Sequence, residues 1–136
     1  MMMQRVELSP LILVVDDDEQ VREWLRIVLE EEGYRVAEAG DGNQAFKTME
    51  REVPDLVVLD IFLPDKDGLE TILQLRNERA SVKVLAVSGQ PIDAYDVFKV
   101  ATTFGAHAAL AKPFRGEDLI ERVRSLVGPV RHQLAS

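Results

Sequence analysis

Polar residues that could do chemistry stand where the apolar runs of this sequence end. These residues are Asp16 and Asp17 after Leu11–Val15, Asp60 after Leu56–Leu59, Ser88 after Val82–Val87 and Lys112 after Ala108–Ala111. If the runs are strands of one parallel sheet, their carboxyl ends share one edge, where open α/β sheets place functional sites. We therefore expect the five polar groups to converge on a single crevice.

Three carboxylates in one crevice repel one another strongly unless a cation lies between them. A hard divalent ion with oxygen ligands meets this need, and a shell completed by water and phosphate oxygens suits Mg²⁺ better than Ca²⁺. Lys112 adds a positive charge for an anion, and Ser88 adds a hydroxyl donor. The residue types predict a magnesium site next to a site for a phosphate-like group.

Each residue also has a plainer interpretation. Any of the three consecutive aspartates at 16–18 could simply cap the next helix, and Asp18 is the best candidate because the helical pattern begins at Glu19. Lys112 alone could be an ordinary surface lysine, and Ser88 with Gly89 could form a plain turn. The functional interpretation is favoured because all these residues fall at the same end of the expected strands.

The elements that must position these residues alternate between apolar runs and helical patterns, which is typical of a parallel sheet covered by helices. The expected strands are 11–15, 34–39, 56–59, 82–87 and 108–111. Apolar residues at helical spacing predict a helix after each strand. In chain order, the five sets of apolar residues are Val21, Trp24, Leu25, Val28 and Leu29; Ala45, Phe46 and Met49 within 43–52; Leu69, Ile72 and Leu73; Val97, Phe98 and Ala101; and Leu119, Ile120, Val123 and Val127. We interpret Trp24 and the two histidines, His107 and His132, as structural.

Composition limits the possible functions. The chain has 136 residues, of which 46% are hydrophobic, enough for the core of one domain. The formal net charge of -8 disfavours binding to nucleic acid or to an anionic membrane surface. There is no Cys, the first residues lack the apolar segment of a signal peptide, and no apolar stretch reaches the roughly 20 residues of a membrane span. We expect a cytoplasmic protein.

Four motifs together resemble the receiver domain of two-component response regulators. They are ILVVDDDEQVR at 12–22, PDLVVLDIFLPDKDG at 54–68, VLAVSG at 84–89 and AKPF at 111–114. The resemblance implies a flavodoxin-like (βα)5 fold with strand order 2-1-3-4-5. It also implies a receiver domain at 10–127, between an N-terminal extension at 1–9 and a tail at 128–136 too short for an effector domain. We therefore expect a stand-alone receiver.

The resemblance assigns a role to each polar residue. Asp60 would be the phosphoacceptor, and Asp16, Asp17 and the backbone carbonyl of Phe62 would join it in holding Mg²⁺, with Asp17 the more direct ligand of the acidic pair. Ser88 and Lys112 would grip phosphoryl oxygens. Further correspondences concern the backbone: a cis peptide bond between Lys112 and Pro113, and a loop after the acceptor shaped by Pro64 and Gly68.

The implied chemistry is transfer of a phosphoryl group from a phosphohistidine of a sensor histidine kinase or a histidine phosphotransfer protein. The product would signal by binding a downstream protein that the sequence does not identify. We expect no enzyme in the usual sense, but a phosphoacceptor with slow self-catalysed phosphotransfer and dephosphorylation. Phe62 and Gln90 would flank the path of the hydrolytic water, and neither favours fast hydrolysis.

One departure from the family pattern affects the output. Ala109 stands where many receivers have a Tyr or Phe that moves on phosphorylation. A methyl group cannot fill the space that such a ring enters. We therefore expect the signal to be weak or to pass through the backbone of the Gly89–Asp96 segment.

Three other functions share some of these sequence features. A haloacid-dehalogenase-like phosphatase also forms an aspartyl phosphate, but it needs a second Asp two residues after its nucleophile, where this chain has Phe62. A flavodoxin-like cofactor binder would need a Gly- and Ser-rich loop after the first strand rather than three aspartates. A receiver that never turns over phosphate and acts as a constitutive interaction module is the remaining alternative; the complete set of motif residues argues against it but does not exclude it.

Overall fold

The computed structural model describes residues 9–61, 68–89 and 94–130, without the side chains of 94–97. Five parallel strands form one sheet in the order β2-β1-β3-β4-β5. The strands are β1 (Leu11–Val15), β2 (Arg35–Ala39), β3 (Leu56–Asp60), β4 (Lys83–Ser88) and β5 (Ala108–Ala111). The helices are α2 (Glu19–Glu31), α3 (Gly42–Arg51), α4 (Gly68–Glu78), α5 (Ala94–Phe104) and α6 (Gly116–Val127). The predicted flavodoxin-like fold and strand order are confirmed.

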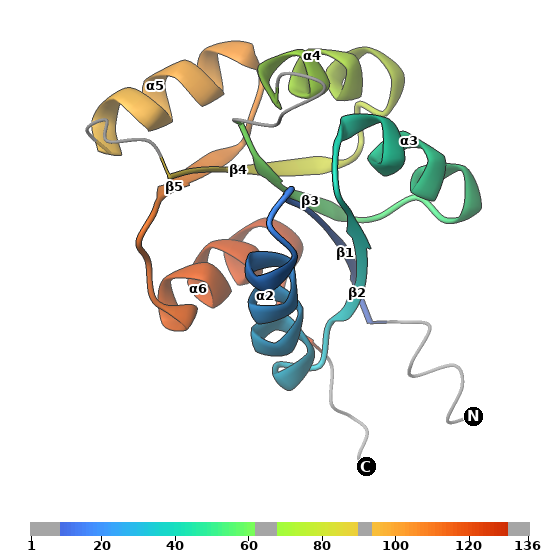
Figure 1. Cartoon of the computed structure of the whole chain (residues 1–136), viewed down its shortest axis with the longest axis vertical. Helices are drawn as coiled ribbons and strands as arrows, with labels where there is room; N and C mark the ends of the chain where they lie inside the picture. Colours follow the sequence, from blue (N-terminus) through green and yellow to red (C-terminus); the bar gives the residue numbers. More distant parts are fainter. Residues whose placement is uncertain (1–8, 62–67, 90–93, 131–136) are drawn as a thin grey trace.

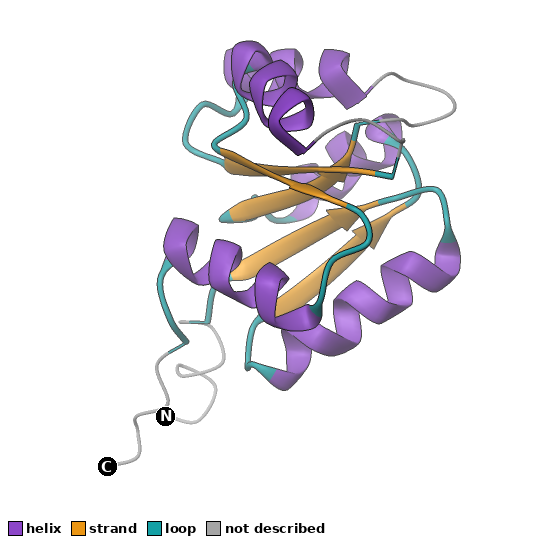
Figure 2. Ribbon diagram, turned by 90° about the vertical axis from the view of Figure 1, so that its left-hand side faces the viewer, coloured by secondary structure: helices purple, strands orange, loops and turns teal. Residues whose placement is uncertain are grey.

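Helices cover both faces of the sheet, α2 and α6 on one face and α3, α4 and α5 on the other (Figures 1 and 2). Every residue of β1 and β3 is buried. Alternate residues of each strand enter opposite cores, because successive side chains of a strand point to opposite faces. Leu13 and Val57 pack with the α3 to α5 side, whereas Ile12 and Val58 pack with the α2 and α6 side. This double burial explains why the strands read as continuous apolar runs.

Some expected details of the helices differ from the structure. Leu73 and Phe98 do not join the core; they are 46% and 51% exposed. In α4 the buried face is formed by Gly68, Thr71, Ile72 and Leu75, so the face that meets the sheet is rotated from the one expected. Trp24 is also 40% exposed, and its ring centroid lies 5.8 Å from that of Phe114.

The parallel topology brings the carboxyl ends of β1, β3, β4 and β5 to one edge of the sheet. Val15 pairs with Leu59, Asp60 with Val87, and Ser88 with Ala111, so the residues after these strands are neighbours in space. None of the helices in the described ranges has the length and apolar composition that crossing a bilayer requires.

Candidate functional site

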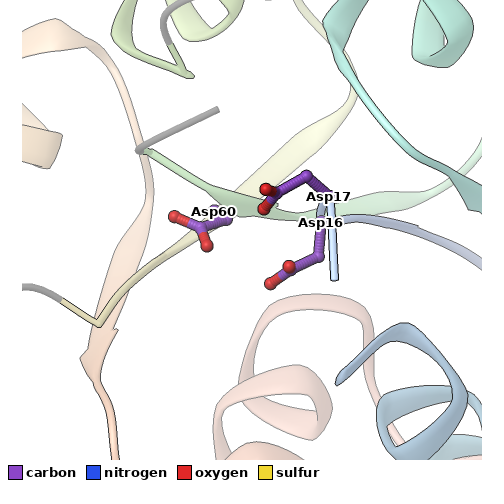
Figure 3. A group of neighbouring side chains, drawn as sticks. All are labelled: Asp16, Asp17 and Asp60. Atoms are coloured by element: carbon purple, nitrogen blue, oxygen red, sulfur yellow. The ribbon is translucent and has the colours of Figure 1, made fainter. Parts of the chain in front are cut away.

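Three carboxylates gather at this edge of the sheet. Asp16 and Asp17 follow β1, and Asp60 is the last residue of β3. Each contributes an oxygen to a group whose members lie within 4.8 Å of one another. Figure 3 shows the three side chains together at the ends of the two strands. Asp16 and Asp60 are buried, whereas Asp17 is exposed, so the cluster opens to solvent on the Asp17 side.

Asp16 is held by backbone contacts as well as by its place after β1. Its N–H donates to the carbonyl of Ala39 at 3.2 Å, and its Oδ1 accepts the N–H of Asp18 at 2.9 Å. Asp18 in turn caps α2, because its Oδ1 accepts the N–H of Gln20 at 2.9 Å. The prediction that Asp18 caps the helix is confirmed. Asp16 and Asp17 are therefore not the N-cap of α2.

Lys112 bridges two of the carboxylates from the end of β5. Its Nζ lies 3.1 Å from Oδ2 of Asp16 and 3.3 Å from Oδ2 of Asp60. Burial alone would lower the pKa of Lys112, but the charges of Asp60 and Asp16 outweigh burial and raise it. The ammonium is therefore charged at neutral pH, so Lys112 is not an ordinary surface lysine.

Ser88 is the last residue of β4 and is fully buried. Its carbonyl accepts the N–H of Lys112 at 2.7 Å, which ties the ends of β4 and β5 together. The structure thus brings Asp16, Asp17, Asp60 and Lys112 into one cluster and places Ser88 at the same edge. Phe62, Pro64 and Gln90, which were also expected near the site, lie outside the described residues.

Gly68 shapes the backbone next to Asp60. A Cβ on this residue would lie 2.3 Å from Cα of Ile61 and 2.7 Å from the carbonyl oxygen of Asp60. Its N–H donates to the carbonyl of Ile61 at 3.1 Å. No side chain fits in this approach, so the expected role of Gly68 in the loop after β3 has a steric basis. The expected cis bond between Lys112 and Pro113 is also present.

The donor set fits a hard divalent cation. Within the part of the chain that the structure describes, three carboxylates face the single ammonium of Lys112, so negative charge remains in excess. All three ligands are oxygens, which is the preference of Mg²⁺. A hollow of about 370 Å³ opens beside Lys112, lined by Asp18, Trp24 and Phe114 among others. The ammonium of Lys112 therefore borders an open hollow on the surface.

His107 is away from this cluster and has a structural role, as expected. Its Nδ1 accepts the backbone N–H of Val84 at 3.0 Å, which joins the beginnings of β4 and β5. Its Nε2 lies 3.4 Å from a guanidinium nitrogen of Arg76. His132 lies outside the described residues.

One contact at the site was missed by sequence reasoning. The guanidinium of Arg22 donates to the backbone carbonyl of Asp16 at 2.7 Å. An arginine six residues after an aspartate has no distinctive pattern, because its direction depends on how the loop turns into α2.

Comparison with known proteins decides the family. The profile described as "Response regulator receiver domain" matches residues 12–124. This chain belongs to that family. The resemblance stated from the four motifs is confirmed, and the structural neighbours of this receiver are receiver domains as well. Receiver domains use Mg²⁺ at an acidic pocket and are phosphorylated by histidine kinases.

Curated relatives are longer than this receiver. "Probable transcriptional regulatory protein TcrX" of Mycobacterium tuberculosis is 36% identical over 126 residues, which cover 92% of this chain and 53% of the relative. The "Alkaline phosphatase synthesis transcriptional regulatory protein PhoP" of Bacillus subtilis is 37% identical, with coverage of 85% and 48%. The receiver thus spans about half the length of these relatives.

Solved structures of similar length share the fold. The receiver domain of NtrX from Brucella abortus superposes with a TM-score of 0.79 at 29% identity, covering 85% of this chain and 97% of that one. A CheY-like receiver domain protein from Methanospirillum hungatei gives 0.77 at 31% identity, with coverage of 86% and 92%.

Proposed function

We propose that this receiver accepts a phosphoryl group on Asp60 in a Mg²⁺-dependent reaction and signals through phosphorylation-dependent binding to another protein. The observation that supports this most directly is the cluster itself: Asp60 lies within reach of Asp16, Asp17 and the Lys112 ammonium at the open edge of the sheet. The proposed domain is 10–127, flanked by the extension 1–9 and the tail 128–136, and the proposed compartment is the cytoplasm.

The donor in this proposal is a phosphohistidine of a sensor histidine kinase or of a histidine phosphotransfer protein. A carboxylate oxygen of Asp60 attacks phosphorus, a P–O bond forms, and the P–N bond to the imidazole breaks. The imidazole nitrogen keeps the bond's electron pair and takes up a proton. Asp60, one of whose oxygens already lies against the ammonium of Lys112, provides the nucleophile.

Mg²⁺ would be held by Asp16, Asp17, Asp60 and the carbonyl of Phe62, and when bound it supplies charge that reduces repulsion between the carboxylate and the phosphoryl group. Lys112 would hold a phosphoryl oxygen, because its ammonium already lies 3.3 Å from Asp60. Ser88 would donate its hydroxyl to another phosphoryl oxygen from the adjacent strand end. The protein's own contribution is mostly the positioning of charge.

The output would leave through the surface of α5, β5 and α6 toward a downstream protein. We propose no direct contact with nucleic acid by the receiver itself, because its formal net charge is -8. The phosphorylated form should decay slowly, since Phe62 is apolar and Gln90 is uncharged at neutral pH. That decay is read as loss of the phosphoryl mass after the donor is removed.

Incubation with Mg²⁺ and phosphoramidate, followed by intact-mass spectrometry, tests the proposal. We expect one phosphoryl mass increment on the wild-type chain, none with EDTA, and none on Asp60→Asn. The variant should fold, because it removes one of three like charges from a crowded site. A mass increment that persists in Asp60→Asn would exclude Asp60 as the acceptor.

A further inference from the structure

Arg22 connects the acidic pair to the second strand. It lies early in α2, and its side chain is 18% exposed. One guanidinium nitrogen, Nη1, donates to the backbone carbonyl of Asp16 at 2.7 Å, and Nε donates to Glu38 at 3.2 Å. A single rigid fork thus holds both the turn after β1 and a side chain of β2.

The carbonyl that Arg22 contacts belongs to the peptide group between Asp16 and Asp17. Because a peptide group is planar, holding its oxygen fixes the direction in which the chain continues to Asp17. The N–H of Asp16 is held by Ala39, and its carboxylate by Asp18 and Lys112. Asp17 is exposed, so we infer that the orientation of the preceding peptide group determines the position of its carboxylate.

Glu38 holds the guanidinium of Arg22 from the other side. One of its oxygens accepts from Arg22, and the other accepts from Nε of Arg26 at 2.8 Å. Arg26 also pairs with Glu30, one turn further along α2. Arg22 and Arg26 therefore share a carboxylate partner and a helix face, but it is Arg22 that donates to the backbone between the two aspartates.

We propose that Arg22 is a positioning residue for the magnesium site, an inference that rests on the proposed function. It holds the Asp16–Asp17 peptide group in the orientation that lets both carboxylates face the same cation. Groups that orient metal ligands without touching the metal typically change metal affinity by 10- to 100-fold. Arg22 would act in this way through a backbone carbonyl rather than through a ligand side chain.

The plainer alternative is that Arg22 only forms a surface ion pair with Glu38. Such pairs contribute little to stability. In that case the guanidinium acts on Mg²⁺ solely by its positive charge, which repels the cation, and its removal would tighten binding. The two interpretations therefore predict opposite signs for the change in Mg²⁺ affinity.

The test compares Arg22→Met with Arg26→Met, each titrated with Mg²⁺ and followed by backbone amide NMR. Both substitutions remove one positive charge beside Glu38 and keep a long side chain with high helix propensity. We expect the Kd for Mg²⁺ to rise about tenfold in Arg22→Met, and to stay unchanged or fall slightly in Arg26→Met. In the metal-free state, the Asp17 amide should shift in the first variant and not in the second.

An Arg22→Met variant that binds Mg²⁺ as tightly as wild type, or more tightly, would overturn the inference while leaving the proposed function intact. A wild-type chain with no Mg²⁺ response would instead overturn the metal site and the inference together. If Arg22→Met does not fold, Arg22→Lys decides, because a lysine ammonium cannot span Asp16 and Glu38 in the same fork geometry. Weakened binding in that variant supports the inference, and wild-type affinity overturns it.

Discussion

The ammonium of Lys112 lies 3.3 Å from the carboxylate of Asp60, although 52 positions separate the two residues in the sequence. Asp60 ends β3 and Lys112 follows β5, and β4 lies between these strands in the sheet. The same ammonium lies 3.1 Å from Asp16, which follows β1. One ammonium thus forms ion pairs with carboxylates from the ends of two strands.

Lys112→Met should destabilise the metal-free protein at pH 7, because Asp16 and Asp60 would lose the charge between them. Removal of one partner from a buried ion pair costs about 3–5 kcal/mol and exposed pairs contribute about 0–1 kcal/mol, so a partly exposed lysine should cost about 2 kcal/mol. Urea unfolding measures the change. Lys47→Met, at an exposed position of α3, is the matched control.

The contribution of Lys112 should also depend on pH. Its pKa is raised from the ordinary value of 10.5, so the stabilisation is complete below pH 10.5 and is lost as the pH rises through the higher folded value. Added Mg²⁺ should restore part of the stability of Lys112→Met. A variant as stable as wild type at pH 7 without metal would contradict this assignment of the ion pair.

Substitution of Asp16 should mainly affect the stability of the protein without metal, whereas substitution of Asp17 should mainly affect the response to Mg²⁺. Asp16→Ala leaves the N–H of Asp18 without its acceptor and should lower metal-free stability by about 1 kcal/mol. Asp17→Ala should leave that stability nearly unchanged, because Asp17 is exposed, yet remove the rise in melting temperature that Mg²⁺ causes. Thermal melts with and without Mg²⁺ measure both effects. If neither variant altered the metal response, the acidic pair would have to be reinterpreted as structural rather than metal-binding.

His107 should make the protein slightly less stable in mild acid. Burial, with Arg76 and Lys83 adding to it, lowers the pKa of His107, and protonation of Nδ1 would break its bond with the N–H of Val84. The unfolded chain therefore binds the proton more readily than the folded chain. The contribution of neutral His107 to the free energy of unfolding is complete above about pH 6.5 and is lost as the pH falls below that value.

Because the His107 ring is exposed, solvent screening keeps the effect small, and we expect about 1 °C between pH 7.5 and 5.5. The melting temperature of His107→Asn should lack this extra decrease in acid, whereas that of His132→Asn should keep it. An identical pH response in all three proteins would show that His107 does not contribute.

The signal should reach the output surface through the 89–98 segment, without an aromatic switch in β5. Ala109 is half-buried and pairs with Ala86, so no ring is present at this position to move on phosphorylation. Addition of Mg²⁺ with beryllofluoride, an acyl-phosphate mimic, should give the largest amide NMR shifts beyond the site at 89–98. Shifts centred on 107–110 with 89–98 unchanged would mean that β5 carries the signal without an aromatic side chain.

The sheet could be predicted from sequence because β1 and β3 are buried on both faces, which leaves continuous apolar runs ended by aspartates. The convergence of Asp16, Asp60 and Lys112 then follows from parallel topology alone. Helix boundaries depend on capping contacts that the apolar pattern does not show: α3 begins at Gly42 rather than 43, because Asp41 caps it by accepting the N–H of Gln44.

Helix orientation and long side-chain contacts could not be predicted in the same way. Leu73 and Ile72 are adjacent apolar residues of α4, and only packing against the sheet decides that Ile72 is buried and Leu73 exposed. The reach of Arg22 to the carbonyl of Asp16 depends on the turn between β1 and α2, which no residue pattern specifies.

The most direct test of the central claim is to locate the modified residue. After reaction with Mg²⁺ and phosphoramidate, sodium borohydride reduces an aspartyl phosphate to homoserine, and peptide mass spectrometry then identifies its position. We predict homoserine at position 60 and at no other aspartate, and none when EDTA replaces Mg²⁺. Homoserine at Asp16 or Asp17, or a phosphoryl group that resists borohydride, would contradict the assignment of Asp60 as the acceptor.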